Sequence, residues 1–201
     1  MPFILIAIGC FFLIFSFFLL KVPFLSAIDL ASVEWFSHKR ILKLNEISIV
    51  LSFIGSLPFV LFITAIWCFY AKLLKKYKKL TFICVGLFGS TTLAWMLKFI
   101  ISRSRPPEVY HLVDVFGSSF PSAHSVYAAA IGCMTIYIYR QSPNYRIIFL
   151  CSILWIIGMG ISRIYLGVHY PSDVLAGWGT SLVYISITYL LFIKLSRTRS
   201  L

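Results

Sequence analysis

The feature that most constrains the fold is a series of six long apolar runs separated by short polar connections. A helix that crosses about 30 Å of hydrocarbon needs roughly 20 residues, and each run approaches or exceeds that length. Bilayer hydrocarbon offers no hydrogen-bond partners, so each segment must satisfy its own backbone groups, as a helix does. No run shows the strict alternation of a transmembrane barrel strand. The predicted spans are residues 3–20, 47–71, 80–101, 122–139, 147–165 and 174–193.

The composition supports an all-α, polytopic membrane protein with one domain over residues 1–201. Of the 201 residues, 60% are hydrophobic and only 12% are charged, whereas a soluble domain carries about 25% charged residues. A cleaved signal peptide is the alternative for the first run. No charge precedes Lys21, and Leu25-Ser26-Ala27 is a poor cleavage site, so we favour a retained helix.

The net charge of +12 raises the question of nucleic acid, but the distribution of the charges favours membrane topology. Cations gather in three connections that alternate with the others along the chain. The positive-inside rule places these connections and both termini in the cytoplasm, and the cations also suit contact with anionic membrane lipids. The three groups are Lys72, Lys75, Lys76, Lys78 and Lys79; Arg140 and Arg146; and Lys194, Arg197 and Arg199.

Two further features have a structural interpretation. The stretch 21–46 mixes charged and apolar residues and predicts a helix lying in the outer membrane interface, with Trp35 and Phe36 at headgroup level. It serves as an anchor or as a guide for a lipid. The five cysteines all fall within predicted spans and form no CxxC pair, so they are interpreted as packing residues.

Ionisable residues that topology does not explain gather near the outer ends of the later helices. Such residues are costly near a membrane and indicate function. Lys98 and Arg105 are seven residues apart, which predicts one helix face carrying a clamp for an anion. A snorkelling lysine and a loop arginine are the alternative. The full set is Lys98, Arg103, Arg105, His124, Arg163, His169 and Asp173.

Two other segments complete the set. Ser122 is a good N-cap, and His124 lies in the first turn that follows, where free N–H groups favour an anion. Pro171 suits a helix start, so His169 and Asp173 are expected to be in contact. Each residue has a simpler interpretation: a cap, a structural histidine, a helix-start charge or, for Arg163, a headgroup contact. Histidines with cations and a single nearby carboxylate suit phosphate chemistry, and they do not suit a zinc site, so we expect no metal and no cofactor.

At these residues the chain resembles the type 2 phosphatidic acid phosphatase (PAP2) superfamily. That family's pattern is K-x6-R-P, then P-S-G-H, then S-R-x5-H-x3-D. The corresponding residues run from Lys98 to Asp173, with Ala123 in the place of the family's glycine. Alanine keeps the backbone N–H, loses easy access to positive φ and adds a methyl group. The residues outside the pattern, Arg103, Glu108 and His111, are interpreted as loop charges.

The resemblance implies a mechanism. His169 would attack phosphorus, Asp173 would orient it, and His124 would protonate the leaving group. Lys98, Arg105, Ser122, Ala123 and Arg163 would bind the phosphate. The implied activity is hydrolysis of a lipid phosphate or diphosphate on the outer face of a bacterial inner membrane. Undecaprenyl diphosphate or phosphatidylglycerophosphate is favoured, with phosphatidate and lipid A as alternatives.

Other functions remain open. A lipid phosphotransferase would use the same site with a different acceptor. A vanadate-dependent haloperoxidase shares the pattern, but those enzymes are soluble. A lipid or ion transporter would show repeats and charges near the midplane, which this sequence lacks. The sequence does not indicate an oligomeric state.

Overall fold

The computed structural model describes residues 1–198, and in that range the regular secondary structure is entirely helical. The elements in chain order are α1 (Pro2–Lys21), α2 (Pro23–His38), α3 (Leu42–Ile54), α4 (Leu57–Leu73), α5 (Tyr77–Ile101), the short 3-10 helix η1 (Glu108–Tyr110), α6 (Ala123–Ile138), α7 (Tyr145–Tyr165) and α8 (Pro171–Thr198).

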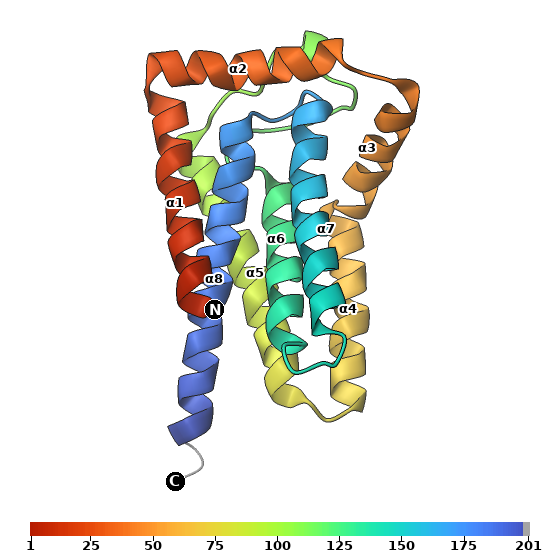
Figure 1. Cartoon of the computed structure of the whole chain (residues 1–201), viewed down its shortest axis with the longest axis vertical. Helices are drawn as coiled ribbons and strands as arrows, with labels where there is room; N and C mark the ends of the chain where they lie inside the picture. Colours follow the sequence, from red (N-terminus) through yellow and green to blue (C-terminus); the bar gives the residue numbers. More distant parts are fainter. Residues whose placement is uncertain (199–201) are drawn as a thin grey trace.

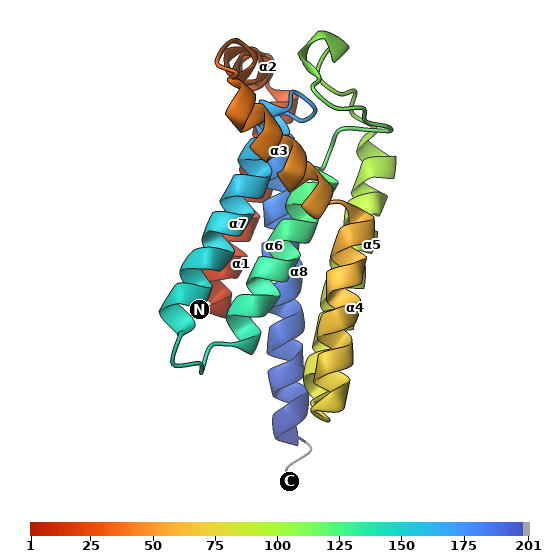
Figure 2. The ribbon, with the colours of Figure 1, turned by 90° about the vertical axis from the view of Figure 1, so that its right-hand side faces the viewer.

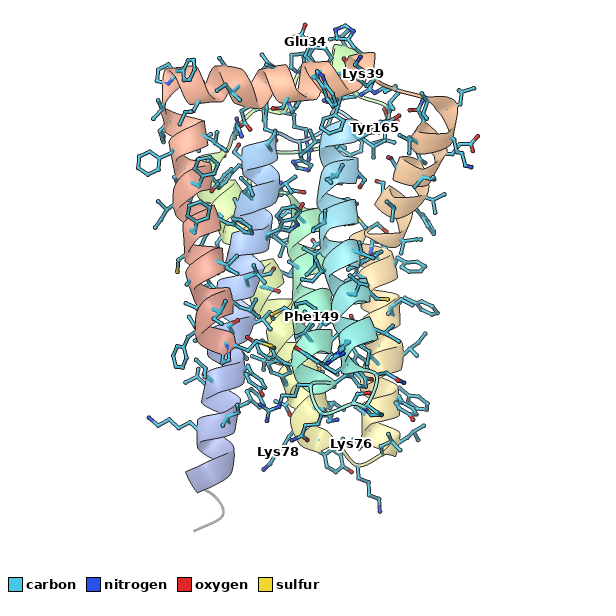
Figure 3. All side chains as sticks on the ribbon, in the orientation of Figure 1. Glu34, Lys39, Lys76, Lys78, Phe149 and Tyr165 are labelled. Atoms are coloured by element: carbon cyan, nitrogen blue, oxygen red, sulfur yellow. The ribbon has the colours of Figure 1, made fainter. Side chains whose placement is uncertain are left out.

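The long helices run along one axis, and α2 lies crosswise over one end of the bundle (Figure 1). The turned view shows that α3 is tilted between α2 and α4 and that the loop carrying η1 lies at the same end (Figure 2). We call this the α2 end. The other end, which we call the basic end, carries the α4–α5 connection with Lys76 and Lys78 (Figure 3). The described chain begins with α1 and finishes with α8, and both of its termini lie toward the basic end of the bundle.

The prediction of six membrane spans is confirmed only in part. Four helices, α1, α5, α7 and α8, are long and apolar enough to cross a membrane in the described range. A fifth span results if α3 and α4 are taken together. The predicted run 122–139 forms α6, which has only 16 residues and extends about 24 Å at 1.5 Å per residue. That length is short of the hydrocarbon thickness.

The predicted single helix over 47–71 is wrong, because the chain breaks at Gly55 and Ser56. Helices α3 and α4 meet there at a bend of 57°. Gly55 ends α3, and Pro58 lies in the first turn of α4. Proline has no N–H to continue the hydrogen-bond ladder, so a new helix starts at this point. The apolar composition concealed this break.

The stretch 21–46 is also not one helix. Val22 is extended and Pro23 starts α2, which ends at His38; residues from Leu42 onward belong to α3. Trp35 on α2 is exposed, whereas Asp29 and Val33, one turn apart, are buried against the bundle. The helix therefore has an inner face that contributes to the structure of the α2 end.

The core is centred on α6, which packs against α5, α7 and α8. Its buried residues include Val126, Ala130 and Met134, which contact Leu87 of α5 and Ile185 of α8 in one apolar cluster. Small side chains on α6 let its neighbours approach closely, as is usual in membrane bundles.

Helices α1 and α8 cross at a pair of glycines. A Cβ atom on Gly179 would lie 2.7 Å from the Gly9 carbonyl oxygen, and one on Gly9 would lie 3.0 Å from the Gly179 carbonyl oxygen. Real Cβ atoms do not approach so closely, so this crossing requires glycine on both helices. It joins the first helix to the last.

The outer surface of the bundle is strongly apolar. Exposed aromatic side chains lie on four of the helices that run along the bundle, including Phe11, Phe62, Phe88 and Phe149. A surface of this kind is costly in water and suits lipid. Together with the spans, it identifies the chain as an integral membrane protein.

Candidate active site

The residues singled out by sequence converge at the α2 end, although they come from four helices and two loops. A cavity of about 650 Å³ opens there. The residues that line it include Lys98, Arg105, Ala123, His124, Arg163 and His169. Ser122 and Asp173 are buried next to this lining.

His169 is held from both sides of its ring. Its Nδ1 lies 3.3 Å from Asp173 Oδ2, and its Nε2 lies 3.2 Å from an Arg105 guanidinium nitrogen. Pro171 starts α8, which places Asp173 in the first turn and four residues after His169. When His169 donates its Nδ1 hydrogen to the Asp173 carboxylate, the lone pair on Nε2 points toward Arg105 and the cavity. Burial lowers the pKa of His169 to about 3, against the opposing effect of Asp173, so the ring is neutral at pH 7.

Asp173 is fully buried and its two oxygens have different partners. Oδ2 faces His169 and accepts hydrogen bonds from the Tyr170 backbone N–H, at 2.9 Å, and from the Ser119 hydroxyl. Oδ1 accepts from the Arg103 guanidinium at 2.8 Å. A buried carboxylate needs such compensation to remain charged, and Ser119 was not anticipated from the sequence.

The interpretation of Arg103 as a loop charge is wrong. Its side chain is only 12% exposed and bridges two buried carboxylates, Asp173 and Asp29. The distance to Asp29 Oδ2 is 2.7 Å. The guanidinium carbon also lies 3.8 Å from the centre of the Tyr170 ring. The sequence predicted one carboxylate at this site, Asp173. The structure has two, Asp173 and Asp29, and both bind Arg103.

Asp29 also holds the beginning of α8. Its Oδ1 accepts from the Ser172 backbone N–H at 2.9 Å, and its Oδ2 accepts from the Ser172 hydroxyl. The first N–H groups of a helix have no partner within the helix, and the helix dipole favours a negative charge there. Burial raises the pKa of Asp29, while Ser172 and Arg103 oppose that effect. A residue of α2 thus fixes the helix start that carries Asp173.

Arg105 is fixed by the backbone of its own loop and of the loop before α8. It donates to the carbonyl oxygens of Phe116, Gly117 and Val168, at 2.9, 3.0 and 2.9 Å. Lys98 donates to the Ser118 carbonyl oxygen of the same loop. The prediction of one shared helix face is wrong, because α5 ends at Ile101 and Ser102 turns left-handed, with φ 43°. Both cations nevertheless line the same cavity.

The break between α3 and α4 supplies an unexpected partner, Ser52. Its hydroxyl accepts from Arg163, and its carbonyl oxygen lies 3.0 Å from His124 Nε2. This carbonyl is in the last turn of α3, where helix carbonyls lack partners within the helix. Arg163 is 1% exposed, and its Nε has no hydrogen-bond partner in the described residues. One serine therefore orients both a histidine and an arginine of the cavity.

Ser122 caps α6 as expected, since its hydroxyl accepts from the Ser125 backbone N–H at 3.4 Å. Ala123 begins the helix and lines the cavity. Its φ is not positive, so the alanine meets no backbone strain there, and its methyl group faces the cavity region. The departure from glycine changes the shape of the cavity rather than the path of the chain.

His111 and Glu108, the other loop residues read as charges outside the motif, do not line the cavity, whereas Asp114 of the same loop does. His111 Nε2 lies 2.9 Å from the Pro106 carbonyl oxygen, within the loop, and Glu108 is exposed on η1. Among residues 1–198, no three His, Cys, Asp or Glu side chains are arranged to hold a metal ion.

Fold and site together define an integral membrane protein in which a neutral histidine, aligned by a carboxylate, faces a cavity carrying three cations. The model of the PAP2 superfamily matches residues 6–197. The chain belongs to the PAP2 superfamily.

Relatives and a solved structure are similar over much of the chain. Phosphatidylglycerophosphatase B of Bacillus subtilis is 32% identical over 150 residues, which cover 70% of this chain and 71% of the relative. A lipid A 1-phosphatase of Rhizobium etli is 33% identical over 144 residues, or 65% and 57% of the two chains. The crystal structure of a transmembrane PAP2-type phosphatidylglycerolphosphate phosphatase from Bacillus subtilis has a TM-score of 0.80 at 25% identity, covering 96% of both chains. The match spans only about half the length of the lipid A 1-phosphatases.

Proposed function

We propose that this protein is a phosphatase that hydrolyses the phosphomonoester or diphosphate of a membrane lipid. The observation that carries the proposal is the position of His169, whose Nδ1 faces Asp173 and whose Nε2 faces Arg105 at the cavity. A neutral, aligned imidazole is a nucleophile, and cations around it stabilise the charge of a transferring phosphoryl group.

In the first step, His169 Nε2 attacks phosphorus and a P–N bond forms while the P–O bond to the leaving group breaks. His124 becomes protonated when the anionic phosphate binds beside it, and it gives this proton to the leaving oxygen. Lys98, Arg105 and Arg163 bind the phosphoryl oxygens, together with the N–H groups at the start of α6. The imidazolium of the phosphohistidine is balanced by Asp173.

In the second step, a water molecule attacks the phosphohistidine. His124, now neutral, takes a proton from the water. The P–N bond breaks, inorganic phosphate leaves, and His169 returns to its neutral form. Every group in this cycle belongs to the chain, so the mechanism requires no metal.

Phosphatidylglycerophosphate is the favoured substrate, followed by undecaprenyl diphosphate. The support is the similarity to the Bacillus subtilis enzymes named for phosphatidylglycerophosphate, which extends over 71% of the relative and 96% of the solved chain. The cationic clusters of the basic end favour a cytoplasmic location for that end and for both termini. The site at the α2 end then faces the outer side of the membrane.

The test is phosphate release by the full-length protein in detergent, from phosphatidylglycerophosphate, undecaprenyl diphosphate, phosphatidate and lipid A. We expect release from at least one lipid and a loss of more than about a thousandfold in His169→Ala. The matched control is His38→Ala, because His38 is an exposed histidine of α2, away from the cavity. Equal activity of His169→Ala and the wild type would refute the proposal.

Treatment with EDTA separates this mechanism from a metal-dependent one. We expect unchanged phosphate release after EDTA and dialysis. A large loss that zinc or magnesium restores would contradict the mechanism. Trapping the acid-labile phosphoenzyme with a labelled lipid diphosphate, and its absence in His169→Ala, would identify the intermediate.

A further inference from the structure

A second cavity, of about 450 Å³, lies at the basic end of the bundle. It is formed by the start of α5, the end of α6 with the residues that follow, and the C-terminal half of α8. Figure 1 shows these segments at the end away from α2. Its lining combines cations with aromatic rings: Lys78, Lys79, Arg140, Phe82, Tyr137 and Tyr189.

No acidic side chain of the protein can neutralise these cations. The chain has only six Asp and Glu residues. They lie on α2, at the start of α3, in the loop between α5 and α6, and at the start of α8, so all belong to the α2 end. The residues are Asp29, Glu34, Glu46, Glu108, Asp114 and Asp173. Any anion that pairs with the cations of the second cavity therefore comes from outside the side chains of this protein.

The aromatic wall is ordered and presents an unused donor. The rings of Tyr137 and Tyr189 stack with centroids 4.0 Å apart. The Arg140 guanidinium carbon lies 5.4 Å from the Tyr189 ring centre. The Tyr137 hydroxyl is 2.7 Å from Ser186 Oγ, whereas the Tyr189 hydroxyl is shielded from solvent and has no hydrogen-bond partner in the described residues. A buried hydroxyl without a partner is uncommon, so this donor is available to a ligand that enters the cavity.

The remaining lining consists of Gln141, which is polar, and of three apolar residues, Ile138, Phe192 and Ile193. Phe192 and Ile193 lie on α8, which is long and apolar enough to cross the membrane, so an amphiphile bound here keeps its hydrocarbon in the bilayer. Neither a histidine nor a carboxylate is among the lining residues. The cavity thus has the groups to bind a phosphate ester but lacks a nucleophile aligned as His169 is.

We propose that this cavity is a binding site for the headgroup of an anionic phospholipid, in the leaflet opposite the active site. Lys79 and Arg140 pair with the phosphate, the Tyr189 hydroxyl donates to a phosphate oxygen, and the acyl chains extend along the apolar part of the lining. Such a site holds the lipid intact and is separate from the catalytic cavity.

The test is native mass spectrometry of the full-length protein with phosphatidylglycerol, and with phosphatidylcholine as the neutral lipid. We expect one phosphatidylglycerol to be retained far more strongly than phosphatidylcholine. Tyr189→Phe keeps the ring stack and removes only the hydroxyl, so retention should fall several-fold while lipid phosphatase activity and Tm are unchanged. The double variant Lys79→Gln/Arg140→Gln should lose about tenfold or more in affinity.

The matched control is Lys72→Gln/Lys75→Gln, which removes the same charge from the same end at exposed residues outside the cavity lining. Equal loss in this control would show general attraction of the lipid to a basic surface and would overturn the site. Displacement of the lipid by millimolar glycerol 3-phosphate or inorganic phosphate would show a soluble-anion site instead. Unchanged retention in both Tyr189→Phe and Lys79→Gln/Arg140→Gln would also refute the proposal.

Discussion

Asp173 divides its two oxygens between the histidine that it aligns and the arginine that it shares with Asp29. The electrostatic field at His169 therefore depends on Asp29, a residue of α2 that does not line the cavity. The other charged or titratable groups that act on His169 are Arg105, Arg163 and His124, and they are unchanged when Arg103 or Asp29 is replaced.

Arg103→Met and Asp29→Asn should move the acid limb of the pH profile in opposite directions. Without Arg103, nothing offsets the negative charge of Asp173, so the pKa of His169 rises. Protonation then inactivates the histidine at a higher pH than in the wild type. Without the Asp29 charge, Arg103 neutralises Asp173 more fully and the pKa of His169 falls. The expected displacements are about half a unit or more. The measurement is kcat/KM against pH, and a purely structural role would lower activity without opposite shifts.

Arg105→Lys should lower kcat/KM by about a hundredfold while the protein stays folded. Arginine donates to three backbone carbonyls and still approaches Nε2 of His169, and lysine cannot reproduce this planar geometry. Steady-state kinetics on the best substrate of the panel would measure the loss. Activity within twofold of the wild type would show that a positive charge alone is sufficient.

The sequence singled out six of the residues that line the cavity, from Lys98 to His169, because each belongs to a motif with short, regular spacing. Asp29 and Ser52 could not be found in that way. Asp29 lies 74 residues before Arg103, and nothing local distinguishes it from other polar residues of an interfacial helix. Ser52 acts through a carbonyl that only the helix break leaves free.

At the scale of elements, the bend between α3 and α4 turns a helix end toward the cavity. Continuous α-helix through Gly55 would have used the Ser52 carbonyl for its own ladder. The segment Gly55-Ser56-Leu57-Pro58 favours a helix break. The prediction of one helix instead followed the length of the apolar run. The bounds of α1, α6 and α7 were predicted to within about two residues, because polar residues border those runs.

Ser52→Ala should reduce kcat by about tenfold, with a small effect on Tm, because it frees the Arg163 guanidinium from its hydroxyl partner. Ser32→Ala is the control, since Ser32 is a half-buried serine of α2 whose hydroxyl bonds the Ile28 carbonyl of its own helix. An equal decrease of kcat in the control would show that Ser52 has no specific role in the cavity. The measurement is kcat and Tm of both purified variants.

Gly179→Ala should lower the Tm of the solubilised protein. The added methyl group would meet the Gly9 carbonyl oxygen at 2.7 Å, and separating two packed helices costs about 1–3 kcal/mol. Gly158→Ala is the matched control on α7, because a Cβ there has no heavy atom within 4 Å. Equal Tm values for both variants would contradict the close crossing.

At the scale of the whole molecule, all six acidic side chains lie at the α2 end, and the clustered lysines lie at the other end (Figure 3). The lysines and arginines of the basic end favour the proposed orientation, in which that end lies in the cytoplasm. The two cavities therefore have different surroundings: the proposed catalytic cavity has carboxylates behind its cations, and the second cavity has none.

Glu34→Cys should react with a membrane-impermeant maleimide in intact cells, whereas Lys76→Cys should react only after lysis. Both residues are exposed, at opposite ends of the bundle. Labelling is measured above that of the wild type, which has cysteines of its own. The reverse pattern would place the catalytic cavity in the cytoplasm and overturn the proposed topology.

The crossing of α1 with α8 has a consequence for biosynthesis. Helix α1 is synthesised long before α8, with which it has its most extensive contacts. Asp29 is likewise synthesised well before its partners Arg103 and Ser172. During translation, α1 therefore lies in lipid without its partner. The bundle closes, and Asp173 aligns His169, only when α8 has been inserted, so a nascent chain stalled before α8 lacks the proposed catalytic arrangement.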